Sequence, residues 1–335
     1  MRRPRSLSAP FAATDAAARR VDHRDYPSLS PSRLERAELG GADMDRTNGF
    51  AETTTRSADG TNVSYRSIGT GPSLVVVPGM NRRALHYDRL ARELSGSFTV
   101  HAVDRRGRGG SGPHRAGHSM RHEVEDVLAV MDDTHSSLLF GHSYGGAVAL
   151  HVALARPPER LVLYEPAVFV GGNIATWQPE MLRAIAKGDL VTAEAILWHG
   201  GRFNVLCRLP LAVVKMFTRL YLAGSEGKEN AALIKTFEPE GRVLMEIDAS
   251  GERYARVAVP TLLLGGTGSS EFLLDALRRL VASLPDARVV VSPGLEHCAP
   301  DRYALGFNSQ RKVARQIRAF LLPQRDTVAL QPRHS

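Results

Sequence analysis

Residues 140–146 read Phe-Gly-His-Ser-Tyr-Gly-Gly and contain the pattern Gly-x-Ser-x-Gly. An apolar run at 137–140 precedes the pattern and predicts a buried strand, and an Ala/Val/Leu-rich segment at 145–154 predicts a helix. On so sharp a turn the serine hydroxyl stands clear of the sheet, at the positive end of the helix dipole. Because larger side chains would collide there, the flanking positions hold glycines. We therefore predict that Ser143 is a nucleophile.

The segments around this turn alternate between strand-like and helix-like patterns. Short apolar runs that end at Gly, Pro or Asp are typical of strands buried on both faces. The predicted strands are 51–56, 62–68, 73–77, 99–103, 137–140, 161–164, 261–264 and 288–291, and the predicted helices are 83–94, 122–131, 145–154, 272–284 and 310–322. This alternation predicts an α/β fold, with a doubly wound and mostly parallel sheet.

One long block interrupts the alternation. Residues 171–256 have helical character without strand-like runs, which predicts a helical cap inserted into a core formed by residues 46–170 and 257–323. The leader, residues 1–45, is rich in Ser, Pro, Ala and Arg, and we expect it to be disordered, as we do the tail at 324–335. The stretch after Arg3 is too polar for an export signal, and translation that starts at Met44 is a second interpretation.

Composition excludes several classes of protein. The 335 residues, 43% of them hydrophobic, allow one large domain or two ordinary ones. Two cysteines, Cys207 and Cys298, are too few for a disulfide framework or a cysteine-built zinc module. No apolar run approaches the ~20 residues that span a bilayer. The net charge of +8 is spread along the chain as arginine, so we predict no nucleic-acid partner. The low cysteine content and the lack of a long apolar run predict a cytoplasmic location and no membrane partner. Oligomeric state stays open.

A serine nucleophile needs a base and an oxyanion hole. The base is expected on a loop after the last strand, where residues 293–297 read Pro-Gly-Leu-Glu-His, so we predict His297. The oxyanion hole needs two main-chain N–H groups. One follows the nucleophile, at Tyr144, and the other is expected after the strand at 73–77, at Met80.

At these residues the chain resembles the α/β-hydrolase family, over about 51–322. The matching text lies at 77–80 (VPGM), 104–111 (DRRGRGGS), 141–146 (GHSYGG), 161–166 (LVLYEP) and 294–297 (GLEH). The resemblance implies Ser143 as nucleophile, His297 as base and a helical cap over the pocket. It does not specify a substrate.

The acid that orients the histidine is where the chain departs from that family. The family usually carries Asp or Glu in the loop after the strand at 261–264, but here the expected positions hold Gly268 and Ser269. We favour Glu165, at the end of the preceding strand, because some relatives place the acid there. Glu271 or Asp275, at the start of the following helix, is an alternative, and a dyad without an acid is another.

Two further patterns compete with this interpretation. Residues 107–112 match the dinucleotide fingerprint Gly-x-Gly-x-x-Gly, but Pro113 argues against the helix that should begin there. His114, His118 and His122 recur at helical spacing, but the glycines and proline among them disfavour a helix. We therefore predict neither a cofactor nor a metal.

These residues together predict a serine hydrolase. We expect it to cleave a small, largely apolar ester or related acyl compound through an acyl-enzyme. The same machinery can hydrolyse carbon–carbon bonds or make peracids, and both stay open as alternatives. A third alternative is a small-ligand-binding protein that does not turn its ligand over, because fold alone does not fix function.

Overall fold

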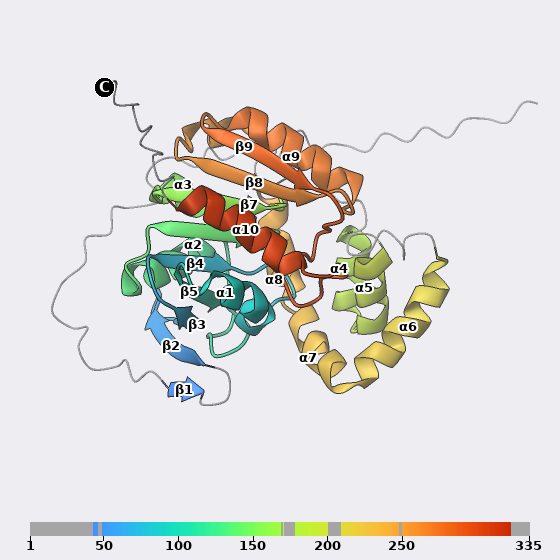
Figure 1. Cartoon of the computed structure of the whole chain (residues 1–335). Coiled ribbons are helices and arrows are strands. Elements are labelled where there is room, and N and C mark those ends of the chain that lie inside the picture. The colour runs from blue at the N-terminus through green and yellow to red at the C-terminus, as the bar shows by residue number, and fades with distance from the viewer. Residues whose placement is uncertain are drawn as a thin grey trace, which may run out of the picture. The chain divides into compact units, whose positions relative to one another are not determined.

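A single mixed sheet forms the centre of the fold (Figure 1). The computed structural model describes residues 43–45, 49–168, 170, 178–199, 209–247 and 250–322. The strands are β1 (Asp43–Asp45), β2 (Phe50–Arg56), β3 (Asn62–Gly69), β4 (Ser73–Val77), β5 (Thr99–Asp104), β6 (Leu138–His142), β7 (Arg160–Tyr164), β8 (Thr261–Gly266) and β9 (Ala287–Ser292). Their order in the sheet is β1-β2-β3-β5-β4-β6-β7-β8-β9.

Strand directions confirm the mostly parallel sheet. From β5 to β9 all neighbouring strands are parallel, whereas the pairs β1–β2, β2–β3 and β3–β5 are antiparallel. β4 and β6 lie at the centre and are buried along most of their length. This is the reason for their continuous apolar sequences, since a parallel strand is covered on both faces.

Helices cover both faces of the sheet, as expected for a doubly wound fold. The core helices are α1 (Asp88–Leu94), α2 (Met120–Asp133), α3 (Tyr144–Ala155), α9 (Glu271–Ser283) and α10 (Ser309–Leu321). On one face α1 packs against α10, and elsewhere α2 packs against α3. The helix predicted at 83–94 begins instead with a 3-10 turn, η2 (Ala84–Tyr87), where the Asp104 carboxylate accepts the Ala84 N–H at 2.8 Å.

The two ends of the chain lie mostly outside the described residues. Residues 43–45, which we had predicted to belong to the disordered leader, form β1 and pair with β2. The remaining predictions for the leader and the tail, and the choice of start codon, stay predictions. Among the residues that the structure describes, no helix is long and apolar enough to cross a membrane.

Between β7 and β8 the described chain is helical. The helices are α4 (Gln178–Ala186), α5 (Leu190–Leu197), α6 (Leu211–Ala223), α7 (Ser225–Ile234), α8 (Phe237–Met245) and the 3-10 turn η5 (Glu252–Arg256). Their buried side chains form a hydrophobic cluster of their own, here called the cap cluster: Met181, Ala184, Ile185, Ala193, Ile196, Ile234 and Phe237. A core of its own lets this block hold its shape while it packs on the sheet.

The carboxyl edge of the sheet collects the polar side chains of interest. Ser143 follows β6, Glu165 follows β7 and His297 lies in the loop that follows β9. Parallel strands bring their carboxyl ends to the same edge, so residues more than a hundred positions apart in the chain meet there.

Candidate active site

Ser143 occupies a strained turn between β6 and α3. Its backbone has φ 55° and ψ −121°, a region that residues other than glycine rarely adopt. Hydrogen bonds hold it there: the Ser143 N–H donates to the Tyr164 carbonyl at 3.0 Å, and the Ser143 carbonyl accepts the Ala167 N–H at 2.8 Å. Strain of this kind persists only where the surroundings enforce it.

The glycines of the turn are required by close backbone contacts. A Cβ on Gly141 would lie 2.5 Å from the Gly145 carbonyl oxygen. A Cβ on Gly145 would lie 2.2 Å from the Val77 carbonyl oxygen, which belongs to the neighbouring strand. Both distances are far below van der Waals contact, so any larger residue would push Ser143 out of position.

Ser143, His297 and Glu165 form one line of hydrogen bonds. The Ser143 Oγ lies 3.0 Å from His297 Nε2, and His297 Nδ1 lies 2.8 Å from Glu165 Oε2. Because a carboxylate accepts only, Nδ1 carries the proton and Nε2 is left to accept one from the serine. The arrangement provides what a general base needs, because the Nε2 lone pair of His297 faces the serine hydroxyl and the bond to Glu165 fixes the ring.

Glu165 is completely buried and fully engaged. Its Oε1 accepts hydrogen bonds from the Gly266 N–H at 2.9 Å and the Ser269 hydroxyl at 2.5 Å. A Cβ on Gly265 would lie 3.2 Å from that oxygen, so this glycine near the end of β8 leaves room for the carboxylate. Gly265 is the sequence signal that could have strengthened the prediction of Glu165.

The alternative acids lie elsewhere. Glu271 begins α9 with its side chain 76% exposed and pairs with Arg278 at 2.8 Å. Asp275, one turn further along, pairs with Arg279 at 2.8 Å. The geometry therefore favours Glu165 over both, and its catalytic role stays a prediction.

A second line of hydrogen bonds, which the sequence did not suggest, supports the site from behind. The Gly79 N–H donates to the Tyr87 hydroxyl at 3.1 Å, and that hydroxyl lies 2.6 Å from His142 Nδ1. His142 Nε2 lies 2.7 Å from the His297 carbonyl, which can only accept, so this nitrogen carries the proton. The hydroxyl therefore donates to Nδ1. The line joins the loop after β4 to the loop that carries His297.

The two main-chain donors predicted for the oxyanion hole belong to the two segments that adjoin Ser143. Tyr144 begins α3, and the N–H groups of a first helical turn have no carbonyl partner within the helix. On the other side Gly79 is packed so closely that a Cβ on it would lie 3.1 Å from Ser143 Cβ. Met80 follows directly in the same loop.

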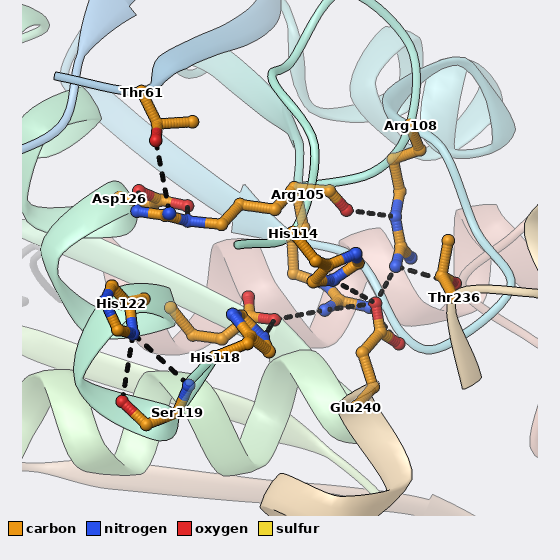
Figure 2. Close-up of polar contacts among 12 residues, drawn as sticks. Thr61, Arg105, Arg108, His114, His118, Ser119, His122, Asp126, Thr236 and Glu240 are labelled. Atoms are coloured by element: carbon orange, nitrogen blue, oxygen red, sulfur yellow. Dashed lines mark hydrogen bonds and ion pairs between the residues drawn. The ribbon is translucent and has the colours of Figure 1, made fainter. Parts of the chain in front are cut away.

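The side chains of His114, His118 and His122 lie near one another, although the segment that joins them is mostly a loop and not a helix (Figure 2). Only His122 is helical, in α2, yet the loop before it brings the rings of His114 and His118 to 4.5 Å. The ligand atoms of these two and of Glu123 lie within 4.8 Å of one another. His122 stacks on His118 with ring centroids 6.0 Å apart, and its Nδ1 accepts the Ser119 N–H at 3.2 Å.

The charges around this histidine group do not suit a metal. Glu123 Oε1 already lies 3.1 Å from both Arg105 Nη1 and His118 Nε2. A divalent cation would therefore share its carboxylate with a buried guanidinium, at high electrostatic cost. The residues fit a buried ion-pair network, here called the arginine cluster: Arg105, Arg108, Glu123 and Glu240.

Burial and neighbouring charge shift the pKa values in the arginine cluster. Burial, then the neighbouring Arg105, pushes the pKa of Arg108 well below its usual range. Burial alone would raise the pKa of Glu123, but Arg105, His118 and Arg108 together outweigh it and the net pKa is lowered. Burial lowers the pKa of His114 to about 3, with a further contribution from His118. The cluster is therefore stable only while its charges stay paired.

Much of the chain is similar in sequence to known proteins. Residues 74–307 match the sequence model described as "Alpha/beta hydrolase family". A lipase of Mycobacterium tuberculosis, LipV, is 35% identical over 109 residues, which is 31% of this chain and 41% of that protein. A 2-(acetamidomethylene)succinate hydrolase of Mesorhizobium japonicum is 25% identical over 248 residues, or 70% and 84% of the two chains.

Structural similarity extends further than sequence identity. A crystal structure of an alpha/beta hydrolase from Sphaerobacter thermophilus superimposes with a TM-score of 0.65 at 24% identity, and covers 80% of this chain and all of the other. The curated relatives of more than 30% identity align over less than half of their own length. At such coverage the similarity identifies fold and family, and leaves substrate and activity to be argued from the site.

Proposed function

Because the chain belongs to the alpha/beta hydrolase family, we propose that it is a serine hydrolase that cleaves a small, largely apolar ester or related acyl compound. One observation carries the proposal: the line of hydrogen bonds from Ser143 through His297 to Glu165, with distances of 3.0 Å and 2.8 Å. A ligand-binding protein would need neither an activated serine nor a base aligned with it.

The reaction begins with acylation of the serine. Ser143 Oγ attacks the substrate carbonyl while His297 Nε2 takes the hydroxyl proton. Glu165 stabilises the imidazolium that forms, and the N–H groups of Met80 and Tyr144 hold the oxyanion. The tetrahedral intermediate then expels the alcohol, which takes the proton from His297 and leaves an acyl-serine.

Deacylation uses the same groups in reverse. His297 removes a proton from water, the hydroxide attacks the acyl carbonyl, and the acid departs as the proton returns to Ser143. The apolar character of the substrate is inferred from the cap. Met80, in the loop beside Ser143, packs its side chain against the cap cluster, and apolar pockets select apolar groups.

Fluorophosphonate labelling and hydrolysis of p-nitrophenyl acetate and butyrate test the proposal. Wild-type protein is expected to label and to turn over both esters. Ser143→Ala is expected to lose the label and to lower kcat by roughly five to six orders of magnitude. Ser283→Ala, at the end of α9, is the matched control and keeps both activities.

The outcome also separates this proposal from a binding function. Wild-type protein that neither labels nor hydrolyses either ester would overturn the activated-serine mechanism. It would leave a ligand-binding protein as the better explanation of the same fold.

A further inference from the structure

Arg105 holds the loop that carries the predicted oxyanion donor Met80. It follows β5, is 1% exposed and donates four hydrogen bonds. Nε donates to the Pro78 carbonyl at 2.9 Å, and Nη2 donates to the Gly79 carbonyl at 3.0 Å. The remaining N–H groups meet two carboxylates, so one guanidinium joins a main-chain loop to an acidic pair.

Peptide planarity turns these bonds into a constraint on Met80. The Gly79 carbonyl and the Met80 N–H belong to one trans peptide group, so they point to opposite sides. Because Arg105 fixes the carbonyl, the Met80 N–H is directed away from the arginine cluster. In the preceding peptide both ends are bonded, the Pro78 carbonyl to Arg105 and the Gly79 N–H to Tyr87.

Arg108 adds a second contact to the same carbonyl. Its Nη1 lies 3.5 Å from the Gly79 oxygen and 3.2 Å from the Arg82 oxygen. Its Nη2 donates to the Thr236 hydroxyl at 3.0 Å and contacts the Glu240 carboxylate (Figure 2). Both arginines thus connect the loop that carries Met80 to one end of α8.

Glu240 is the carboxylate that the cap supplies to this pair of cations. It lies on α8 and is completely buried. Its Oε2 accepts a hydrogen bond from Arg105 Nη2 at 3.1 Å, and its Oε1 forms an ion pair with Arg105 Nη1 at 3.1 Å. Two guanidinium groups that are buried near each other repel, and neighbouring anions are needed to offset this repulsion. Displacement of α8 would remove one of the two anions of the cluster.

The Met80 side chain provides an independent link to the cap. It packs against the cap cluster, which is built from α4, α5, α7 and α8. The loop between β4 and η2 is therefore held on its carbonyl side by arginines paired with Glu240, and at its side chain by apolar contact with the cap. Both contacts are made only while the cap packs against the core in this position.

We propose that Glu240 is a positioning residue through which the seated cap sets the orientation of the Met80 N–H. Glu240 anchors Arg105 and Arg108, and these hold the Gly79 carbonyl so that the N–H on the other side of the peptide faces the oxyanion. The oxyanion hole is then complete only while α8 is in place. This inference rests on the proposed hydrolase function.

Glu240→Gln tests the inference, because it keeps the shape and removes the charge. We expect kcat to fall by about tenfold, less than the ~100-fold that follows complete loss of one oxyanion donor. KM should change by less than about twofold, because the oxyanion contact forms mainly in the transition state. Phenylboronic acid forms a tetrahedral serine adduct, and its affinity should fall by the same factor as kcat.

Glu238→Gln is the matched control. Glu238 lies on the same helix, with its side chain 47% exposed and paired to Arg242 one turn away. It should keep wild-type kcat and boronate affinity. Thr236→Ala removes the hydrogen bond that Arg108 donates to the Thr236 hydroxyl, together with the bond from that hydroxyl to the Leu233 carbonyl. It keeps Glu240 in place and serves as the milder variant if Glu240→Gln does not fold. We expect it to lower kcat and boronate affinity by roughly twofold to threefold.

Arg105→Lys separates orientation from charge. Lysine keeps the cation but cannot bond two carbonyls and a carboxylate in one plane, so kcat and boronate affinity should fall as in Glu240→Gln or further. The inference is overturned if Glu240→Gln and Thr236→Ala keep wild-type kcat, or lose kcat with boronate affinity unchanged. An inactive wild type would instead contradict the hydrolase function itself.

Discussion

Two completely buried carboxylates, Glu165 and Glu240, occupy opposite kinds of surroundings in this molecule. Glu165 accepts from a main-chain N–H, a hydroxyl and an imidazole. Glu240 faces two guanidiniums. The difference matters because a carboxylate that already pairs with fixed cations gives less electrostatic stabilisation to a positive charge that forms later. Glu165 is suited to stabilise a transient imidazolium, and Glu240 is suited to hold structure.

The sharpest test of this contrast is removal of the Glu165 charge. Glu165→Gln should lower kcat by about 10² to 10⁴-fold, because the amide cannot stabilise the imidazolium and can favour the wrong tautomer of His297. Steady-state hydrolysis of p-nitrophenyl butyrate gives the measurement. Glu271→Gln and Asp275→Asn, on α9, are the controls and should match wild type. Retained activity in Glu165→Gln would assign the acid elsewhere.

The arginine cluster should respond in stability as a set of paired charges. Glu240→Gln leaves Arg108 without its cap carboxylate and should lower the free energy of unfolding by about 3 kcal/mol. Adding Arg108→Met removes the excess cation as well, so the double variant should be more stable than Glu240→Gln alone. Urea denaturation monitored by circular dichroism measures both. Simple additivity of the two losses would contradict charge pairing in the cluster.

Acid sensitivity offers a smaller test of the same region. Burial lowers the pKa of His114 from 6.5 to about 3. Between these values the unfolded chain binds one proton more than the folded chain, so stability falls as pH drops below 6.5. The contribution to the slope is about 1.4 kcal/mol per pH unit.

Replacing that histidine should therefore flatten the dependence. We expect His114→Gln to have a shallower decline in the free energy of unfolding between pH 6.5 and pH 4 than wild type, measured by urea denaturation at each pH. His135→Asn, at an exposed histidine, is the control and should follow the wild-type curve. Identical slopes for His114→Gln and wild type would mean that His114 is protonated in the folded state.

The smallest effect is expected from the neutral donors around Glu165. Ser269→Ala removes one hydroxyl and leaves the Gly266 and His297 bonds in place. A hydrogen bond from a hydroxyl to a carboxylate contributes about 1.5 kcal/mol, so kcat should fall by roughly tenfold. Ser270→Ala, next in the chain, is the control for local disturbance. A loss as large as that of Glu165→Gln would show that the hydroxyl, and not the carboxylate charge, controls His297.

Much of the fold was readable from local patterns. Short apolar runs and helical periods identified most strands and helices to within one or two residues, because they depend on neighbours in the chain. The errors lie where distant groups decide local structure. The segment at 84–87 is a 3-10 turn that meets Asp104, and residues 43–45 extend the sheet only because β2 is beside them.

The candidate site was predictable in part for the same reason. Ser143 is placed by its immediate neighbours, since the glycines and the flanking strand and helix define the turn. Arg105 and Glu240 were missed, although three arginines directly after a buried strand were a signal that buried acids must be near. Which acids those are could not be read, because Glu240 is 135 positions from Arg105.

The sequence by itself determined the elbow at Ser143 and the parallel sheet, since each follows from steric and hydrophobic rules acting over a few residues. It pointed to His297 only through the position of that residue after the last strand. Only the tertiary structure decided which carboxylate meets His297 and which cap residue meets the arginines. Those choices depend on β7 lying next to β8 and on α8 resting against the loop after β5. Such contacts join residues far apart in the chain, where distance and desolvation, rather than spacing, select the partner.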